Sequence, residues 1–322
     1  MPRKTLIFGN GLGMALDAQH FSLSRALGDV WDHPHHLPAH QKALVARCIG
    51  DDRNAPEGED QLDTLHVVVA ACNMLNKTGD DEVHWLSDEG QEFPAAVAKY
   101  IHRVASDLHI YDDPLPNAFL DPLFDFVRDT RSNIATLNYD RLLYGALIDA
   151  GFMNGYRGCL VDGMTDGGFG TDTLVRRYGN NFGYYLHLHG SPLFYDDRLG
   201  AARKMTRAML TMNSAEISNH IVLTHVTHKR SVIDASDVLS TYWEYLHDCC
   251  HEVEEIIVFG YSGGDTHLNE VLAAYARTAA IRVVEWEGAG SQAARERFWQ
   301  QILRTEHFDL IRQANILDFT DW

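Results

Sequence analysis

The sequence lacks paired-cysteine motifs and long apolar runs. Its five cysteines include no C-x-x-C pair, which argues against a zinc ribbon or a disulfide framework. No apolar run approaches the roughly 20 residues that a membrane-spanning helix needs, and the first residues lack the apolar stretch of a secretion signal. These absences predict reduced thiols and a cytoplasmic protein without membrane association.

Basic residues are also scarce. Lys and Arg number 27 against 45 Asp and Glu, so the formal net charge is −18. Because nonspecific nucleic-acid affinity comes from clustered Lys and Arg, we expect no direct nucleic-acid binding, although a local basic patch stays open. Hydrophobic residues make up 45% of the chain, as in folded globular proteins. With 322 residues the chain can bury one large core or two smaller ones.

Strand-like apolar runs alternate with helix-like segments. The alternation predicts an α/β fold, with a Rossmann-like, mainly parallel sheet and helices on both faces. We expect one domain over residues 1–322, with a helical insertion at about 21–130 that could form a subdomain. Strands are predicted at 5–9, 132–138, 184–188, 221–224, 255–260 and 281–285, with an edge segment at 308–319. Helices are predicted at 61–77, 94–108, 117–128, 141–150, 235–251, 265–277 and 291–304.

Three stretches are less regular. Residues 21–62 contain Pro-interrupted and polar tracts, residues 151–183 are rich in Gly and Asn, and a polar helix is expected near 197–209. We interpret 151–183 as a long loop over the binding pocket. Four histidines lie within 31–40, but prolines interrupt any regular face and no acidic or thiol partner has ligand spacing, so we favour a surface loop or lid over a metal site.

The first strand runs straight into a glycine turn. Glycine allows positive φ, and backbone N–H groups at a helix start can approach a diphosphate. The turn comprises Gly9, Asn10, Gly11, Leu12 and Gly13. Its spacing is not the full G-x-G-x-x-G, so a tight structural turn explains it equally well. On the nucleotide interpretation, Gly11→Val should block binding, because a side chain would fill the space needed by the phosphate.

Two further strand ends carry polar side chains. Asn138 and Asp140 follow the strand at 132–138, and helix capping would explain one of them but not both. His189 follows the strand at 184–188 and could act as a general base near neutral pH. Taken alone, it would more often be a surface histidine or a satisfied core histidine.

A fourth strand end, after residues 255–260, is rich in small residues. A plain capped turn explains this segment about as well as a nucleotide-facing turn does. The residues that we expect to face a nucleotide are Gly260, Ser262, Asp265 and Asn269. Because the carboxyl ends of parallel strands lie at one edge of a sheet, the four segments predict a single crevice.

The order of these motifs resembles the sirtuin-like domain of bacterial antiphage NAD hydrolases. The resemblance covers roughly residues 4–290 and implies that Asn138 and His189 are the catalytic pair. It also implies that the opening turn and the Gly-Tyr-Ser segment hold NAD, the expected substrate, which is cleaved to ADP-ribose and nicotinamide. The matching motifs are the glycine turn, Thr136-Leu-Asn-Tyr-Asp140, Leu188-His-Gly-Ser191 and Phe259-Gly-Tyr-Ser-Gly-Gly-Asp-Thr-His-Leu-Asn269.

The chain departs from true sirtuin deacylases in two respects. It has no zinc module with paired C-x-x-C motifs, and its opening turn lacks the Pro-Asp-Phe-Arg continuation. Both departures argue against protein deacylation, and no metal is expected. An NAD-dependent deacylase or ADP-ribosyl transferase, and a non-catalytic nucleotide-binding regulatory subunit, stay open as alternatives.

The expected chemistry suits the implied pair. Nicotinamide leaves NAD as a neutral group, so no general acid is needed; the site has to stabilise an oxocarbenium-like ribose and position a water. Asn138 can orient that water or the ribose hydroxyls, and His189 can accept a proton. Asp140 is available to hydrogen-bond the nicotinamide amide.

The resemblance also implies partners. Proteins of this kind act as toxic effectors, so we expect a homo-oligomer whose assembly controls activity, with residues 61–128 as a candidate interface. Related short sirtuin-like proteins work beside a hexameric translocase ATPase, and such a partner is a further expectation from the resemblance alone.

Overall fold

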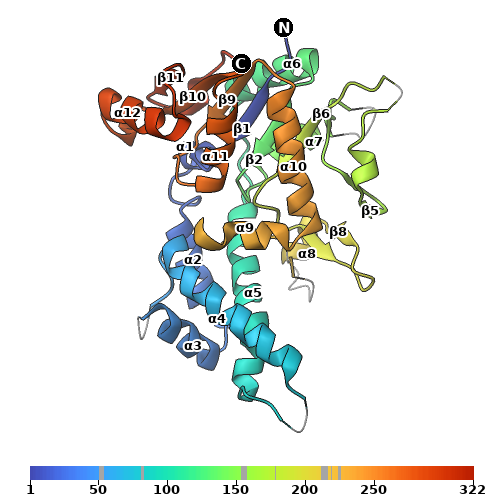
Figure 1. Ribbon diagram of the computed structural model, residues 1–322, viewed down its shortest axis with the longest axis vertical. Helices are drawn as coiled ribbons and strands as arrows, with labels where there is room; N and C mark the ends of the chain where they lie inside the picture. The colour runs from blue at the N-terminus through green and yellow to red at the C-terminus, as the bar shows by residue number, and fades with distance from the viewer. Residues whose placement is uncertain are drawn as a thin grey trace.

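The computed structural model describes residues 1–50, 54–80, 83–153, 158–177, 179–211, 217–218, 220–223 and 226–322. Its centre is a seven-stranded sheet in which every strand pair is parallel (Figure 1). The strands are β1 (Thr5–Phe8), β2 (Asn133–Thr136), β3 (Leu160–Val161), β6 (Gly183–His187), β9 (Glu255–Phe259), β10 (Ala280–Trp286) and β11 (Asp309–Gln313). The predicted α/β, Rossmann-like fold is confirmed.

The strand order is β11-β10-β9-β1-β2-β6-β3. Six of these strands follow the doubly wound order 3-2-1-4-5-6, with β3 added at the outer edge. The chain moves outward from β1 through β2 and β6, and then returns to the other side of β1 with β9. Ligands of such sheets bind outside the carboxyl ends of the strands at this reversal, so the topology points to the turns after β1 and β9.

Helices cover both faces of the sheet, as predicted. Alternate strand side chains serve opposite faces: Ile7 belongs to one buried cluster, and Leu6 and Phe8 belong to the other. One face is covered by α10 (Asp237–His251), α11 (Thr266–Tyr275) and α12 (Gln292–Leu303). The other is covered by α1 (Gly11–Leu16), α6 (Asn117–Thr130), α7 (Leu142–Asp149) and the turn η4 (Ile316–Asp318).

A helical subdomain lies beyond the carboxyl edge of the sheet, in the lower half of Figure 1. It has its own buried cluster and consists of α2 (Leu23–Asp32), α3 (Ala39–Ile49), α4 (Glu59–Thr78) and α5 (Asp88–His109). A further helix, α9 (Val226–Asp234), packs against α4 and α10. In contrast, α6, which the predicted insertion at 21–130 included, packs its apolar side on the sheet.

The expectation of irregular structure over 21–62 was wrong, because α2 and α3 fill much of it. Ser22 caps α2 by accepting the Arg25 N–H at 3.4 Å, and Pro38 sits at the start of α3, where its missing N–H costs nothing. The prolines therefore separate two helices instead of preventing them. Among the described residues no group of three or more His, Cys, Asp or Glu side chains could hold a metal ion.

The polar helix expected near 197–209 is instead a hairpin, formed by β7 (Phe194–Asp196) and β8 (Ala202–Lys204), followed by the short α8 (Arg207–Thr211). The carboxylate of Asp197 accepts the N–H groups of Leu199 and Ala201 and so closes the turn. These local hydrogen bonds stabilise the turn in preference to a helix.

Two other predictions also changed. The strand expected at 221–224 is reduced to an isolated bridge between Ile221 and Gly190, and Thr224 lies outside the described residues. The segment 151–183 is not one loop, because it contains β3, β4 (Met164–Thr165), β5 (Gly168–Phe169) and the turn η2 (Thr171–Thr173). Helix α9 was not predicted. Within the part of the chain that the structure describes, none of the helices combines the length and apolarity needed to cross a bilayer.

Candidate functional site

The strand register brings the predicted motifs to one edge. Phe8 pairs with Thr136 on one side and with Phe259 on the other, Thr136 pairs with His187, and Phe259 pairs with Val284. Residues that follow these positions therefore emerge side by side, where a cavity of about 800 Å³ opens. It lies at the reversal of strand order, where the fold places ligands.

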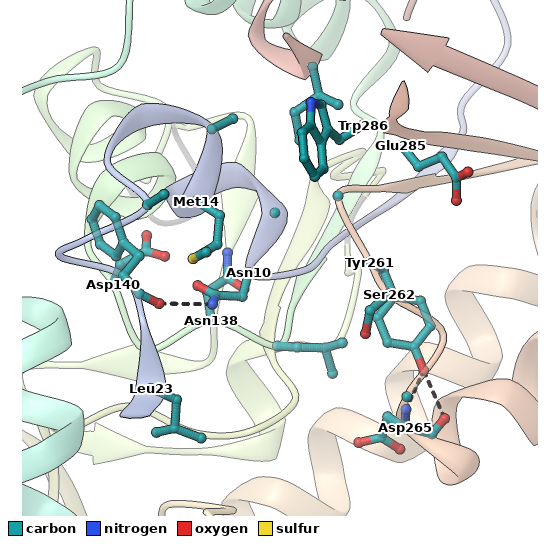
Figure 2. A pocket seen from close by; sticks show the side chains of 18 of the residues that line it. Asn10, Met14, Leu23, Asn138, Asp140, Tyr261, Ser262, Asp265, Glu285 and Trp286 are labelled. Atoms are coloured by element: carbon teal, nitrogen blue, oxygen red, sulfur yellow. Dashed lines mark hydrogen bonds between the residues drawn. The ribbon is translucent and has the colours of Figure 1, made fainter. Parts of the chain in front are cut away.

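Figure 2 shows the cavity with Asn138 and Asp140 on one side and Glu285 and Trp286 on the other. Eight of the predicted site residues line it, namely Asn10, Gly11, Asn138, Asp140, His189, Gly260, Ser262 and Asp265. The lining also contains polar side chains outside the set of predicted site residues, namely Glu59, Tyr139, Lys229, Tyr261, Glu285, Arg295 and Asn315.

Four predicted residues do not line the cavity but support it. The carbonyl of Gly9 accepts a hydrogen bond from Asn138 Nδ2 at 3.1 Å. Leu12 is buried in the core, and Gly13 lies against the ring of Phe21. Asn269 donates to the carbonyl of Gly263 at 2.8 Å and so closes the turn after β9.

The glycine turn packs closely against the turn after β9, which is the structural role that the sequence left open beside nucleotide binding. The Gly11 N–H donates to the carbonyl of Gly260 at 2.7 Å, and the Gly9 N–H donates to Phe259 at 2.9 Å. A Cβ at Gly11 would lie 2.5 Å from the Gly260 oxygen, and Gly260 itself has φ +61°. These glycines therefore pack the turns after β1 and β9 against each other, and the Gly11 N–H is not free for a phosphate.

Asn138 is held as part of the sheet edge. Its Nδ2 donates to Gly9 and to the carboxylate of Asp140 (Figure 2), and its N–H donates to Thr136 Oγ1 at 3.0 Å. Its Oδ1 is buried and finds no hydrogen-bond partner among the residues that the structure describes. Because an unpaired buried polar atom is costly, an oxygen left open beside a cavity marks a place where a ligand hydroxyl or a water can donate.

His189 lies in the same cavity and is 6% exposed. Its Nε2 lies 2.9 Å from Oδ2 of Asp265, which also caps α11 by accepting the N–H groups of His267 and Leu268 at 2.9 and 3.1 Å. Burial opposes ionisation of Asp265, but the hydrogen bond from His189 and the nearby positive charges hold its pKa well below the ordinary value. The ionised carboxylate accepts the Nε2 proton, which leaves Nδ1 as the basic nitrogen.

Two ion pairs extend this arrangement. Lys229 Nζ lies 3.1 Å from Asp265 Oδ2 and 3.0 Å from Glu59 Oε2. Although burial disfavours the Lys229 charge, the two carboxylates outweigh it and raise the pKa of this amine. A row of alternating charges therefore runs from α4 through α9 to α11 and reaches His189.

In the described part of the chain, no cationic side chain pairs with Asp140. Burial raises the pKa of Asp140 to about 6, although hydrogen bonds from Leu142, its own backbone and Asn138 act in the opposite direction. Near neutral pH this carboxyl is therefore poised to change its protonation state next to Asn138.

The other end of the cavity carries an acidic and an aromatic side chain. Glu285 is 4% exposed and is neutralised by Arg295 at 2.8 Å and Arg312 at 3.3 Å, with Trp299 Nε1 donating at 3.0 Å. The indole of Trp286 is 58% exposed at the end of β10. Figure 2 shows this indole across the cavity from Met14 and Asn10.

Sequence reasoning could have found some of the residues it missed. Glu285 and Trp286 end a predicted strand and follow the same rule as Asn138 and His189. Glu59 and Lys229 have no such signal, because each sits on a helix that reaches the site through long-range packing. Neither a scan of protein-family models nor a search of curated proteins found a match to this chain, so the geometry carries the functional argument.

Proposed function

We propose that this protein is an NAD hydrolase that cleaves the nicotinamide–ribose bond to give ADP-ribose and nicotinamide. One observation carries the proposal: a carboxamide with an unpartnered oxygen, Asn138, shares a cavity with an imidazole whose Nε2 is bound by an ionised carboxylate, the pair His189 and Asp265. Asn138 and His189 are also the catalytic pair that the sequence resemblance implies.

The reaction needs little more than these groups. The bond between C1′ and the nicotinamide nitrogen breaks with its electron pair on nitrogen, so nicotinamide leaves neutral and the ribose becomes oxocarbenium-like. Asn138 Oδ1 accepts a hydrogen bond from the water or from a ribose hydroxyl and so fixes its position. As the water oxygen bonds to C1′, its proton passes to His189 Nδ1, and Asp265 stabilises the imidazolium through Nε2–H.

The cavity also suits an extended dinucleotide. Five neighbouring strands, from β10 to β6, contribute residues to its wall, and at about 4.8 Å per strand spacing these ends span about 19 Å. Trp286 offers an aromatic face for a base at the end opposite His189. A volume of about 800 Å³ lies within the range of ligand-binding cavities.

One site assignment changes within this proposal. Asp265, expected to contact the dinucleotide, has one oxygen on the α11 N–H groups and the other on His189 and Lys229. We assign it the task of orienting His189. Asp140 holds the amide of Asn138 and stays available for the nicotinamide amide.

The test is to incubate the purified chain with NAD and to follow nicotinamide and ADP-ribose by chromatography. Release of both in equal amounts, without any protein substrate, supports the proposal. Product that forms only on an acylated or acceptor protein would favour a deacylase or a transferase. Tight NAD binding without any product would favour a regulatory subunit.

A defence role and assembly follow from the resemblance and belong to the same proposal. An effector that depletes NAD has to be controlled, so we propose an oligomeric active form, either alone or beside a translocase ATPase. Light scattering under assay conditions tests the first part, and a fully active monomer would contradict it.

A further inference from the structure

We propose that Lys229 and Glu59 are positioning residues that act on His189 through Asp265, so that the packing of α9 and α4 against the site biases the protonation state of the base. The inference rests on the proposed function only where activity is the readout. It concerns residues that no sequence motif singled out and that come from different elements, α9 and α4.

The geometry is that of a buried charge row. The side chains of Asp265, Lys229 and His189 are 4%, 5% and 7% exposed, and Glu59 at the outer end is 31% exposed. Each link has hydrogen-bonding distance, namely 3.0 Å from Glu59 to Lys229, 3.1 Å from Lys229 to Asp265 and 2.9 Å from Asp265 to His189. Charges this close and this shielded interact strongly.

Each member of the row changes the field at its neighbour. Lys229 offsets part of the negative charge of Asp265, and this weakens the stabilisation that Asp265 gives to a protonated imidazole. Glu59 in turn offsets part of the charge of Lys229. Loss of Lys229 should therefore favour the imidazolium, whereas loss of the Glu59 charge should favour the neutral base.

Other titratable groups surround the row. Tyr139 packs its ring 6.4 Å from that of His189, and its hydroxyl donates to the carbonyl of Val222 at 2.5 Å. Burial raises the pKa of this phenol well above its ordinary value, so it stays neutral. Asp140 faces the same cavity, and His267 lies beside Asp265. None of these supplies the alternating charges that Lys229 and Glu59 provide.

The charge row links the packing of α4 and α9 against the sheet to catalysis. Glu59 is the first residue of α4 in the helical subdomain, whereas His189 follows β6 in the sheet. If α9 moves away, Asp265 loses its compensating cation, which favours the protonated, inactive form of the base. If α4 alone moves away, Lys229 loses Glu59 and the neutral base is favoured. The two helices can thereby act on the reaction without touching the substrate.

The test compares charge-removing variants over pH. For Lys229→Met we expect the acid limb of kcat/KM to move by about one unit to higher pH, so that activity falls by up to about tenfold on the acid side of the profile and returns in alkaline buffer. For Glu59→Gln we expect a smaller move to lower pH. Lys229→Arg keeps the charge and should restore the wild-type profile.

A second readout does not depend on turnover. Two-bond proton–nitrogen NMR correlations follow the titration midpoint of the His189 imidazole, which a His189→Ala spectrum assigns. The midpoint should move in opposite directions in Lys229→Met and Glu59→Gln. If the wild-type chain releases no nicotinamide, the proposed function fails while this titration still tests the charge row.

Arg230→Met is the matched control, because it removes a cation from the same helix at a side chain that is 76% exposed. It should leave both readouts within a few tenths of a pH unit of wild type. Lys229→Met leaves buried carboxylates without a cation and could unfold the chain; in that case Glu59→Gln alone decides. Shifts of the same sign in both variants, or no shift in Glu59→Gln, overturn the inference.

Discussion

The two walls of the cavity are held in different ways. The strand wall, formed by residues that follow β1, β2, β6, β9 and β10, is fixed by backbone contacts such as Gly11 to Gly260 at 2.7 Å. The helical wall contains Glu59 and Lys229 and joins the strand wall through ion pairs of side chains. A substitution of one side chain leaves most backbone contacts in place, whereas the helical wall depends on single side chains. The strand wall therefore suits fixed catalytic groups, and the helical wall suits control of their activity.

The largest effect is expected at the strand wall. His189→Ala should lower kcat for NAD cleavage by about 10²- to 10⁴-fold, because the base is lost. Asn138→Ala should cost a similar factor, because the water or ribose is no longer positioned. If the two act as one unit, the double variant should be little worse than either single one. Nicotinamide release by folded protein, checked by circular dichroism, measures all three.

His187 provides the control for this experiment, because it lies two residues before His189 but outside the cavity. It is 4% exposed and is surrounded by the rings of Tyr144, Tyr185 and Phe194. Its Nε2 is buried without a hydrogen-bond partner within the described ranges. His187→Phe should keep full NAD turnover. Loss of turnover in His187→Phe, with turnover retained in His189→Ala, would mean that His187 and not His189 is the catalytic histidine.

The strand wall was largely predictable from the sequence. Short, fully buried apolar runs mark β1, β2, β6 and β9, and in a parallel sheet the residues that follow such runs have to meet. That rule placed Asn138 and His189 in one cavity. It did not reveal that the glycines pack against each other, because the partner turn lies far away in the sequence.

The helical wall was not predictable. The Pro-interrupted and polar tracts within residues 21–62 hide the apolar pattern of α2 and α3, and α9 has too little apolar periodicity to be predicted. Glu59 and Lys229 look like ordinary surface charges in the sequence, and only the packing of α9 against α4 brings them to Asp265. Such pairings depend on tertiary structure, which local patterns do not encode.

Gly11→Val tests the close backbone packing of the strand wall. We now expect a loss of about 3 kcal/mol in the free energy of unfolding, because the new side chain meets the backbone of Gly260 at 2.5 Å and neither turn can yield easily. Lost NAD binding would then follow from a distorted cavity. Thermal unfolding separates the two causes: a variant as stable as wild type that fails to bind NAD would restore the direct phosphate role.

A smaller effect, on the pH dependence of stability, is expected at Asp140. Its pKa of about 6 lies above the ordinary 3.8, so the folded protein binds this proton more tightly than the unfolded chain does. The resulting stability is fully present below about pH 4 and is lost as the pH rises to about 6. Asp140→Asn removes this loss, so the stability of the variant relative to wild type should rise by about 2 to 3 kcal/mol between pH 4 and pH 7. Urea unfolding at both pH values checks it, and equal differences at the two would contradict the raised pKa.

The smallest effect is expected within the helical subdomain, at Gly28. This glycine lies inside α2, and a Cβ built there would meet no atom within 4 Å. Gly28→Ala should therefore raise the free energy of unfolding by about 0.5 to 1 kcal/mol, because alanine restricts the unfolded chain and favours the helix. NAD turnover should stay unchanged, since the ion pairs of the helical wall do not involve this position. Comparison with Gly11→Val separates a glycine that close backbone packing requires from one that it does not. A loss of stability in Gly28→Ala would contradict the open space beside this position in α2.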